Sequence, residues 1–132
     1  MNNPMAAYNV SKFGVVTLTE GLHHDLTLRQ AKLKASVLCP GWVKTRIAES
    51  DRHRGASGNI DPRPLDSVTA QTSLSMRNAV QSGIAPEQVA DAVFAAIENE
   101  RFYILTHPET RAGVRLRMED ILQERLPTLA PV

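Results

Sequence analysis

Apolar residues recur at three- and four-residue spacings from Met5 to about Arg29. They are Val10, Phe13, Val16, Leu18, Leu22, Leu26 and Leu28. This spacing predicts a long helix with a broad apolar face. Asn3 followed by Pro4 supplies a start, because an Asn cap and a Pro at the first position both favour a helix. Gly14 and Gly21 each cost such a helix about 1 kcal/mol relative to Ala, so we expect them to mark close packing against a neighbouring element.

Two short apolar runs predict strands. Leu33–Cys39 is partly β-branched and apolar at its centre, and Pro40 with Gly41 ends it, which is typical of a buried strand. Phe102–Leu105 combines aromatic and β-branched side chains and predicts a second strand. The single cysteine, Cys39, is interpreted as a small buried residue rather than a reactive thiol.

The segment 46–83 is too long for a plain connection. Residues 46–64 are polar and rich in Gly and Pro, which predicts a loop. Apolar residues then recur at loosely helical spacing up to Gly83, which is interpreted as a helix stop. Segments of this length are usually functional lids or disordered. Leu74 and Met76 would either line a pocket or belong to the core of a lid helix.

The remaining elements complete an α/β pattern. Pro86 opens a helix that runs to about Asn99, and Pro108 starts a last helix before an extended, proline-containing end. A strand, a crossover with helices and a second strand form a parallel unit whose crossover is right-handed. A sheet of two parallel strands leaves one edge of each strand unpaired and is only marginally stable on its own. The pattern therefore predicts half of a doubly wound parallel-sheet fold, with residues 1–132 as a single partial domain.

Length, charge and composition narrow the class of protein. At 132 residues the chain is at most one domain, and 42% hydrophobic with 22% charged residues is ordinary for a soluble globular protein. The net charge of +1, with both signs scattered, gives no basic stripe for nucleic acid. No apolar run reaches the roughly 18 residues of a membrane span, and the N-terminus is no secretory signal. One cysteine fits a reducing cytoplasm, which is the predicted location.

Tyr8 and Lys12 are the first candidates for chemistry. Four residues apart in a helix, their side chains lie on one face. A free phenol has a pKa of about 10, and a neighbouring ammonium favours the phenolate and lowers that pKa. The pair would then act as a general acid/base toward a carbonyl or an alcohol. The spacing by itself also fits a half-buried Tyr and a solvated Lys on an amphipathic helix.

The order of motifs resembles the short-chain dehydrogenase/reductase family. Tyr-x-x-x-Lys at Tyr8–Lys12 is followed by a strand and by Pro-Gly-x-Val-x-Thr within Val37–Thr45, with further similarity at Ala85–Ala90 and Arg101–Pro108. The resemblance covers most of the chain but only the C-terminal half of a family member. It implies a Rossmann-like fold and an NAD(P)-dependent interconversion of a carbonyl and an alcohol. Tyr8 and Lys12 would be its proton-transfer pair, and Lys12 would also bind the nicotinamide ribose.

The resemblance also implies a cofactor-binding segment. Pro40, Gly41, Val43 and Thr45 would contact NAD or NADP, with the Thr45 hydroxyl at the nicotinamide carboxamide. They follow the end of a predicted strand, where open α/β sheets bind ligands, although an ordinary turn explains the same residues. The substrate would be a small-molecule carbonyl or alcohol, and the long helix implies a homo-oligomer in the complete protein. No two of the four histidines are placed to chelate a metal together, and no metal site is expected.

Three family features are not found in the sequence. It has no glycine-rich turn for a pyrophosphate, no Ser precedes Tyr8, and Asn2 and Asn3 are too close to Tyr8 to match the upstream Asn of the family. We therefore expect that residues 1–132 alone do not make a working enzyme and that Met1 is an internal methionine of a longer reading frame. The alternative to an oxidoreductase is a catalytically inert fragment or an oligomerisation module that lacks the dinucleotide-binding half.

Overall fold

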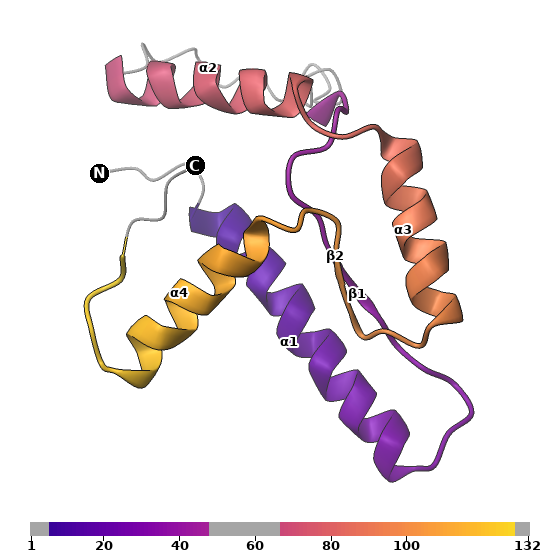
Figure 1. The fold of residues 1–132 in the computed structure, drawn as a ribbon. Helices are drawn as coiled ribbons and strands as arrows, with labels where there is room; N and C mark the ends of the chain where they lie inside the picture. The colour runs from indigo at the N-terminus through magenta and orange to yellow at the C-terminus, as the bar shows by residue number, and fades with distance from the viewer. Residues whose placement is uncertain (1–5, 48–66, 129–132) are drawn as a thin grey trace, which may run out of the picture. The chain divides into compact units, whose positions relative to one another are not determined.

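A computed structural model describes residues 6–47 and 67–128. The elements are α1 (Ala6–Leu28), β1 (Val37–Cys39), α2 (Ser67–Gln81), α3 (Pro86–Glu98), β2 (Tyr103–Leu105) and α4 (Thr110–Leu122), as Figure 1 shows. Helices flank two strands, which confirms the predicted α/β class. Most of the predicted loop at 46–64 and the extended chain end beyond residue 128 lie outside the described residues. None of the helices within the described ranges has the length and apolar content needed to cross a membrane.

The two strands form a parallel pair, as the crossover pattern predicts. Val37 lies opposite Tyr103 and Cys39 opposite Leu105. The pairing begins where the Val37 amide donates to the Phe102 carbonyl at 2.8 Å. Both strands are shorter than the apolar runs in the sequence, because Leu33 and its neighbours precede the first of these hydrogen bonds and stay outside the ladder.

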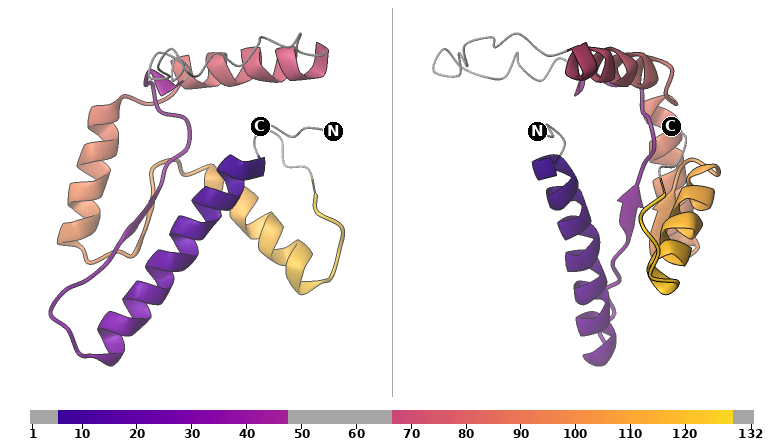
Figure 2. Two further views of the ribbon diagram at one scale, coloured as in Figure 1. Left: turned by 180° about the vertical axis from the view of Figure 1, so that it is seen from behind. Right: turned by 90° about the vertical axis from the view of Figure 1, so that its left-hand side faces the viewer.

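The chain divides into two compact units. The first contains the chain up to Cys39 and from Ala92 onward, and the second contains Pro40–Asp91, so that the division falls directly after β1 and within α3. In the first unit α1 lies along β1, which Figure 2 shows from two further directions. The proposed cofactor segment that follows Cys39 therefore belongs to the second unit.

The buried part of the first unit is small. Val37, Ala96 and Ile104 contribute one buried apolar side chain each from β1, α3 and β2. Most large apolar side chains of α1 stay exposed. They include Val10, Phe13, Val15, Leu18, Leu22 and Leu28. The sequence period thus predicted the helix correctly, but the apolar face it encodes is largely uncovered by the described residues.

The expected close packing at Gly14 and Gly21 is wrong for the described part of the chain. A Cβ built on either glycine meets nothing within 4 Å. Both glycines therefore weaken α1 without allowing a neighbour closer than an alanine would.

Side-chain contacts hold α1 to the rest of the first unit at both ends of the helix. The Tyr103 hydroxyl donates to the Glu20 carboxylate at 2.6 Å, and the His23 ring lies 4.9 Å from the Phe102 ring. Near the other end of α1, the Arg117 guanidinium from α4 lies 5.0 Å from the centre of the Phe13 ring. Polar and aromatic contacts thus anchor the helix where apolar burial does not.

Three helices end in the same way without glycine. Gln30, Glu100 and Glu124 adopt φ values of 51°, 53° and 51°, each two residues beyond the last residue of α1, α3 or α4. After α1, for example, the Ala31 amide donates to the Leu26 carbonyl at 2.9 Å. This is the Schellman closure of a helix, whose left-handed residue is usually glycine.

The chain that follows α4 is tied back to that helix by Asp120. Asp120 is buried, only 4% exposed, and its Oδ2 accepts from the Thr128 amide at 2.8 Å. The Arg125 guanidinium lies 3.0 Å from Oδ1. The hydrogen bond from Thr128, and next the charge of Arg125, hold the pKa of Asp120 below its ordinary value, although burial opposes them.

The second unit is organised around a short bridge between Val43 and Ile84. α2 confirms the helical spacing of the sequence, and Val80 on its last turn is buried. Met76 lies half-buried one turn before Val80, which favours the core interpretation for this residue, whereas Leu74 is exposed. Gly83 follows the helix end but is not a left-handed stop, because no glycine among the described residues has a positive φ.

Candidate active site

The helix α1 brings Tyr8 and Lys12 together. The Lys12 ammonium lies 5.2 Å from the centre of the Tyr8 ring, and Tyr8 is 44% exposed. A cation at this distance is attracted by the face of an aromatic ring. The four-residue spacing therefore produces the predicted neighbourhood, with the ammonium over the ring and both side chains open to solvent.

The same helix carries its anchor two turns further along. Glu20 accepts the Tyr103 hydroxyl proton, and this hydrogen bond fixes α1 against β2. It raises the pKa of Tyr103, and burial and the negative charge of Glu20 act in the same direction. The two tyrosines of the chain thus have opposite neighbours, since Tyr8 lies beside an ammonium and Tyr103 on a carboxylate.

The four predicted cofactor residues follow β1 in the second unit. Pro40 and Thr45 are exposed, and Gly41 and Val43 are half-buried. Val43 is paired with Ile84, which fixes the middle of the segment. The structure thus places Tyr8 with Lys12 in one unit and this segment in the other.

Comparison with known proteins gives a consistent result. No family model matches the chain. A solved short-chain dehydrogenase/reductase from Burkholderia phymatum, in complex with NAD, superposes with a TM-score of 0.85 at 42% sequence identity, over 95% of this chain and 44% of that one. The CLA biosynthesis dehydrogenase/reductase of Lactiplantibacillus plantarum is 33% identical over 125 residues, which cover 93% of this chain and 44% of the relative.

The chain is similar to the C-terminal part of short-chain dehydrogenases/reductases. A third relative, the C alpha-dehydrogenase of a Sphingobium strain, is 27% identical over 91% of this chain and 38% of its own length. The chain therefore spans less than half the length of these relatives and corresponds to the C-terminal part of the family fold. This confirms the resemblance predicted from the motifs.

Sequence reasoning did not identify Glu20 or Tyr103 as partners. They are 83 positions apart, and nothing in the local pattern of either residue indicates the other. Burial, and next the charge of Glu20, raise the pKa of the Cys39 thiol. Cys39 is half-buried and not fully buried as the sequence predicted.

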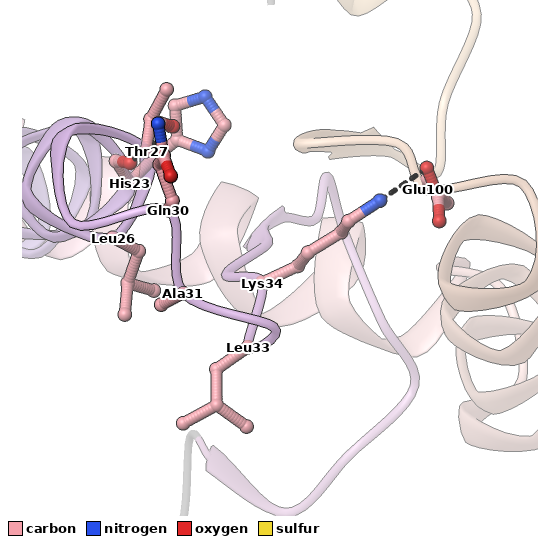
Figure 3. Close-up of a pocket in the computed structure, with 8 residues that line it drawn as sticks. All are labelled: His23, Leu26, Thr27, Gln30, Ala31, Leu33, Lys34 and Glu100. Carbon is pink, nitrogen blue, oxygen red and sulfur yellow. Dashed lines mark hydrogen bonds and ion pairs between the residues drawn. The ribbon is translucent and has the colours of Figure 1, made fainter.

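A cavity of about 450 Å³ lies in the first unit, at the end of α1 remote from Tyr8. Figure 3 shows its lining residues, among which Lys34 forms an ion pair with Glu100. His23 lines this cavity and follows Tyr8 by fifteen residues, or roughly 22 Å along a helix axis. The cavity is therefore separate from the Tyr8 and Lys12 pair, and it contains none of the predicted site residues.

The described histidines take part in structural contacts. His107 is buried after β2, where its Nδ1 lies 2.7 Å from the Thr106 hydroxyl and its carbonyl accepts from the Thr110 hydroxyl at 2.7 Å. Within residues 6–47 and 67–128, no three His, Cys, Asp or Glu side chains are grouped as metal ligands would be.

Proposed function

We propose that this chain is part of an NAD(P)-dependent oxidoreductase that interconverts a carbonyl and an alcohol. The observation that carries the proposal is the placement of the Lys12 ammonium 5.2 Å from the Tyr8 ring on one exposed helix face. A phenol on an exposed face with an ammonium on the same helix turn is suited to general acid/base chemistry. The naming of the relatives as dehydrogenases and reductases supports the same reaction class.

In this proposal Tyr8 transfers the proton. Its hydroxyl donates a proton to the carbonyl oxygen during reduction, which leaves the phenolate, and in the reverse direction the phenolate oxygen takes the proton of the alcohol. The bound nicotinamide would supply or accept the hydride. Lys12 assists because its three N–H donors hold the ribose hydroxyls of the cofactor.

The segment after β1 is proposed to bind the nicotinamide end of the cofactor. Gly41 has no side chain to obstruct a ring, and the exposed Thr45 hydroxyl offers a hydrogen bond to a carboxamide. Val43 keeps the segment in shape through its pairing with Ile84. Pro40 completes the set at the carboxyl end of a parallel strand, where α/β folds bind ligands. This segment thus offers contacts for the nicotinamide end of the cofactor. Residues 46–83, of which 48–66 lie outside the described residues, are proposed as the substrate lid.

The exposed face of α1 supports a second candidate function. Val10 and Leu18 are each 75% exposed, and Leu28 is 82% exposed. Covering such side chains gains about 25 cal/mol per Å² of apolar surface, which favours association with another polypeptide. In this candidate the chain is an oligomerisation module without catalysis.

Nucleotide binding by the purified chain separates the two candidates. NADH and NADPH are titrated into the chain and into the Lys12→Ala variant. Lys32→Ala is the control, because Lys32 is likewise an exposed lysine but lies beyond the end of α1. Micromolar binding that Lys12→Ala weakens at least about 10-fold, and that Lys32→Ala keeps, supports an oxidoreductase. A folded chain that binds neither nucleotide favours the oligomerisation module.

The proton-transfer role has its own measurement. In a preparation that reduces carbonyls, Tyr8→Phe should lower the rate at least about 100-fold and leave nucleotide affinity nearly unchanged. Full activity in a correctly folded Tyr8→Phe variant would remove Tyr8 from the mechanism.

A further inference from the structure

A cavity of about 500 Å³ lies beside α4 in the first unit. The wall on the helix is formed by residues at three- and four-residue spacings, which share one helix face. These residues are Gly113, Leu116, Arg117, Asp120 and Ile121. After α4 the chain reverses, and residues 125–128 return beside the helix as the opposite wall (Figure 1). The volume is typical of a site for a small organic molecule.

One carboxylate oxygen of Asp120 has no hydrogen-bond donor among the described residues. Asp120 is buried, and its Oδ2 accepts from the Thr128 amide, whereas Oδ1 accepts no hydrogen bond. The Arg125 guanidinium forms an ion pair with Oδ1 at 3.0 Å but does not donate a hydrogen bond to it. Buried polar atoms nearly always have a hydrogen-bond partner. A molecule that enters the cavity with an N–H or O–H group would supply the donor that Oδ1 lacks.

The guanidinium groups that line the cavity favour an aromatic ring. Arg117 lies 5.0 Å from the centre of the Phe13 ring, so one of them already contacts an aromatic side chain. Arg125 pairs through an N–H nitrogen with Asp120 and, at 4.0 Å, with Glu119, and its side chain is 46% exposed. A guanidinium that uses its N–H edge for carboxylates still has a flat face on which an aromatic ring can stack.

The charges of the cavity favour a neutral ligand. An ammonium would enter beside two guanidinium groups, those of Arg117 and Arg125. A carboxylate would lie beside Asp120, which is ionised because the Thr128 hydrogen bond and the charge of Arg125 hold its pKa below the ordinary value. Like charges repel strongly at such distances. A neutral hydroxyl group avoids both repulsions and can still donate to Oδ1.

We propose that the cavity beside α4 binds a neutral phenol, whose hydroxyl donates to Oδ1 of Asp120 and whose ring lies between Leu116 and the Arg125 guanidinium. The phenol supplies the missing donor and covers apolar surface of the helix wall at the same time. Neither Tyr8 nor the segment after β1 takes part, so this site is independent of the proposed function.

Three related probes test the two features of the ligand. The purified full chain is titrated in a calorimeter with 4-ethylphenol, with 4-ethylanisole, which keeps the ring but cannot donate, and with 4-ethylcyclohexanol, which keeps the hydroxyl but has no aromatic face. We expect the Kd of 4-ethylphenol to be at least about 10-fold lower than that of either other probe, because each of them loses one of the two interactions.

Filling the cavity assigns the binding to this site. A Cβ built on Gly113 meets nothing within 4 Å, so a larger side chain is accommodated there and occupies the space of the ligand. Gly113→Leu should therefore raise the Kd of 4-ethylphenol at least about 10-fold. Gly21→Leu is the matched control, because Gly21 is also a helical glycine with open space around its Cβ position but lies on α1. It should leave the Kd unchanged.

Replacing the acceptor tests the role of Asp120. An Asn carboxamide keeps one oxygen for the Thr128 amide and offers an NH₂ donor in place of the second oxygen. Asp120→Asn should therefore bind 4-ethylphenol no more tightly than 4-ethylanisole. Circular dichroism shows whether the variant is folded, and if it is not, the three probes and the Gly113→Leu variant still decide the question.

Several results would overturn the inference. They are no detectable binding of 4-ethylphenol, equal affinity of the wild type for 4-ethylphenol and 4-ethylanisole, and tighter binding of 4-ethylbenzoate than of 4-ethylphenol. An unchanged Kd in a folded Gly113→Leu variant would mean that the phenol binds elsewhere on the chain. Nucleotide is absent from all of these titrations, so their failure leaves the oxidoreductase proposal untouched, and failure of NADH to bind leaves the phenol site untouched.

Discussion

Replacing Gly83 by alanine should destabilise the second unit, although alanine normally stabilises a chain relative to glycine. The added Cβ would lie 2.5 Å from the Trp42 carbonyl carbon, about 0.9 Å inside ordinary contact distance, and 2.8 Å from the Val43 nitrogen. Both atoms belong to the main chain and cannot rotate away. The clash therefore has to be relieved by separating the two backbone segments.

The expected cost follows from what that separation removes. Two hydrogen bonds connect these backbone segments: the Ile84 amide donates to the Trp42 carbonyl, and the Lys44 amide donates to the Ile84 carbonyl. A typical internal hydrogen bond contributes about 0.5–1.5 kcal/mol net, and overpacking a filled site costs about 1–3 kcal/mol. Since both descriptions concern the same displacement, we expect a loss of about 1–3 kcal/mol in the free energy of unfolding.

Two glycines of the same chain provide matched controls with the opposite sign. Nothing lies within 4 Å of a Cβ built on Gly14 or Gly21, and both are inside α1. Gly14→Ala and Gly21→Ala should each stabilise the chain by about 0.5–1 kcal/mol, because glycine loses more backbone entropy in a helix. Urea unfolding is followed by circular dichroism for all variants and by the emission of Trp42 for the second unit.

The sign of each change tests a separate step of the reasoning. A Gly83→Ala variant as stable as the wild type would show that the bridge to Trp42 is not formed in solution. A loss of stability in Gly14→Ala or Gly21→Ala would mean that α1 is closely packed in solution, as the sequence alone suggested. The glycine set therefore distinguishes a helix that is open on this face from one that a partner covers.

Two further expectations concern titratable groups. In a Tyr8→Phe background the remaining phenol, Tyr103, should ionise above a pH of about 10. Glu20→Gln should lower the midpoint of this ionisation in an absorbance titration, and an unchanged midpoint would exclude the hydrogen bond between Glu20 and Tyr103. Because the folded pKa of Tyr103 is raised, its stabilisation is present below the unfolded pKa and is lost as pH rises through the folded value. Asp120 behaves oppositely, since its lowered pKa gives stability above about 4 that is lost on acidification. Asp120→Asn should therefore lower the free energy of unfolding near neutral pH and make it depend less on acidification, which urea unfolding at several pH values would measure. If the wild type and the variant lose stability in parallel on acidification, the Thr128 contact has no such role.

The elements of this fold could be predicted because their signals are local. The helical period of α1 and the apolar runs of β1 and β2 are read over a few neighbouring residues. Strand ends were less well predicted, because pairing starts where Val37 meets Phe102 and not where the apolar run begins. The helix ends at Gln30 and Glu100 were also invisible, since left-handed closures there use residues that favour no such conformation.

The same distinction between local and long-range signals applies to the candidate site. Tyr8 and Lys12 were predictable because a helix of any origin brings side chains four residues apart onto one face. Glu20 and Tyr103 were not, because their contact depends on how α1 lies against β2. The depressed pKa of Asp120 likewise arises from a chain reversal that brings the Thr128 amide back to α4.

Gly83 shows why a correct local inference can still miss the role of a residue. A glycine just beyond a helical segment is ordinarily a left-handed stop, and α2 does end at Gln81. Its φ is not positive, however, and the requirement for glycine comes from the Trp42 main chain, 41 positions earlier in the sequence. The family motif indicated Pro40, Gly41, Val43 and Thr45 but gave no reason to single out the residue between Gly41 and Val43. The backbone contact with Gly83 shows that the main chain of this residue is closely packed.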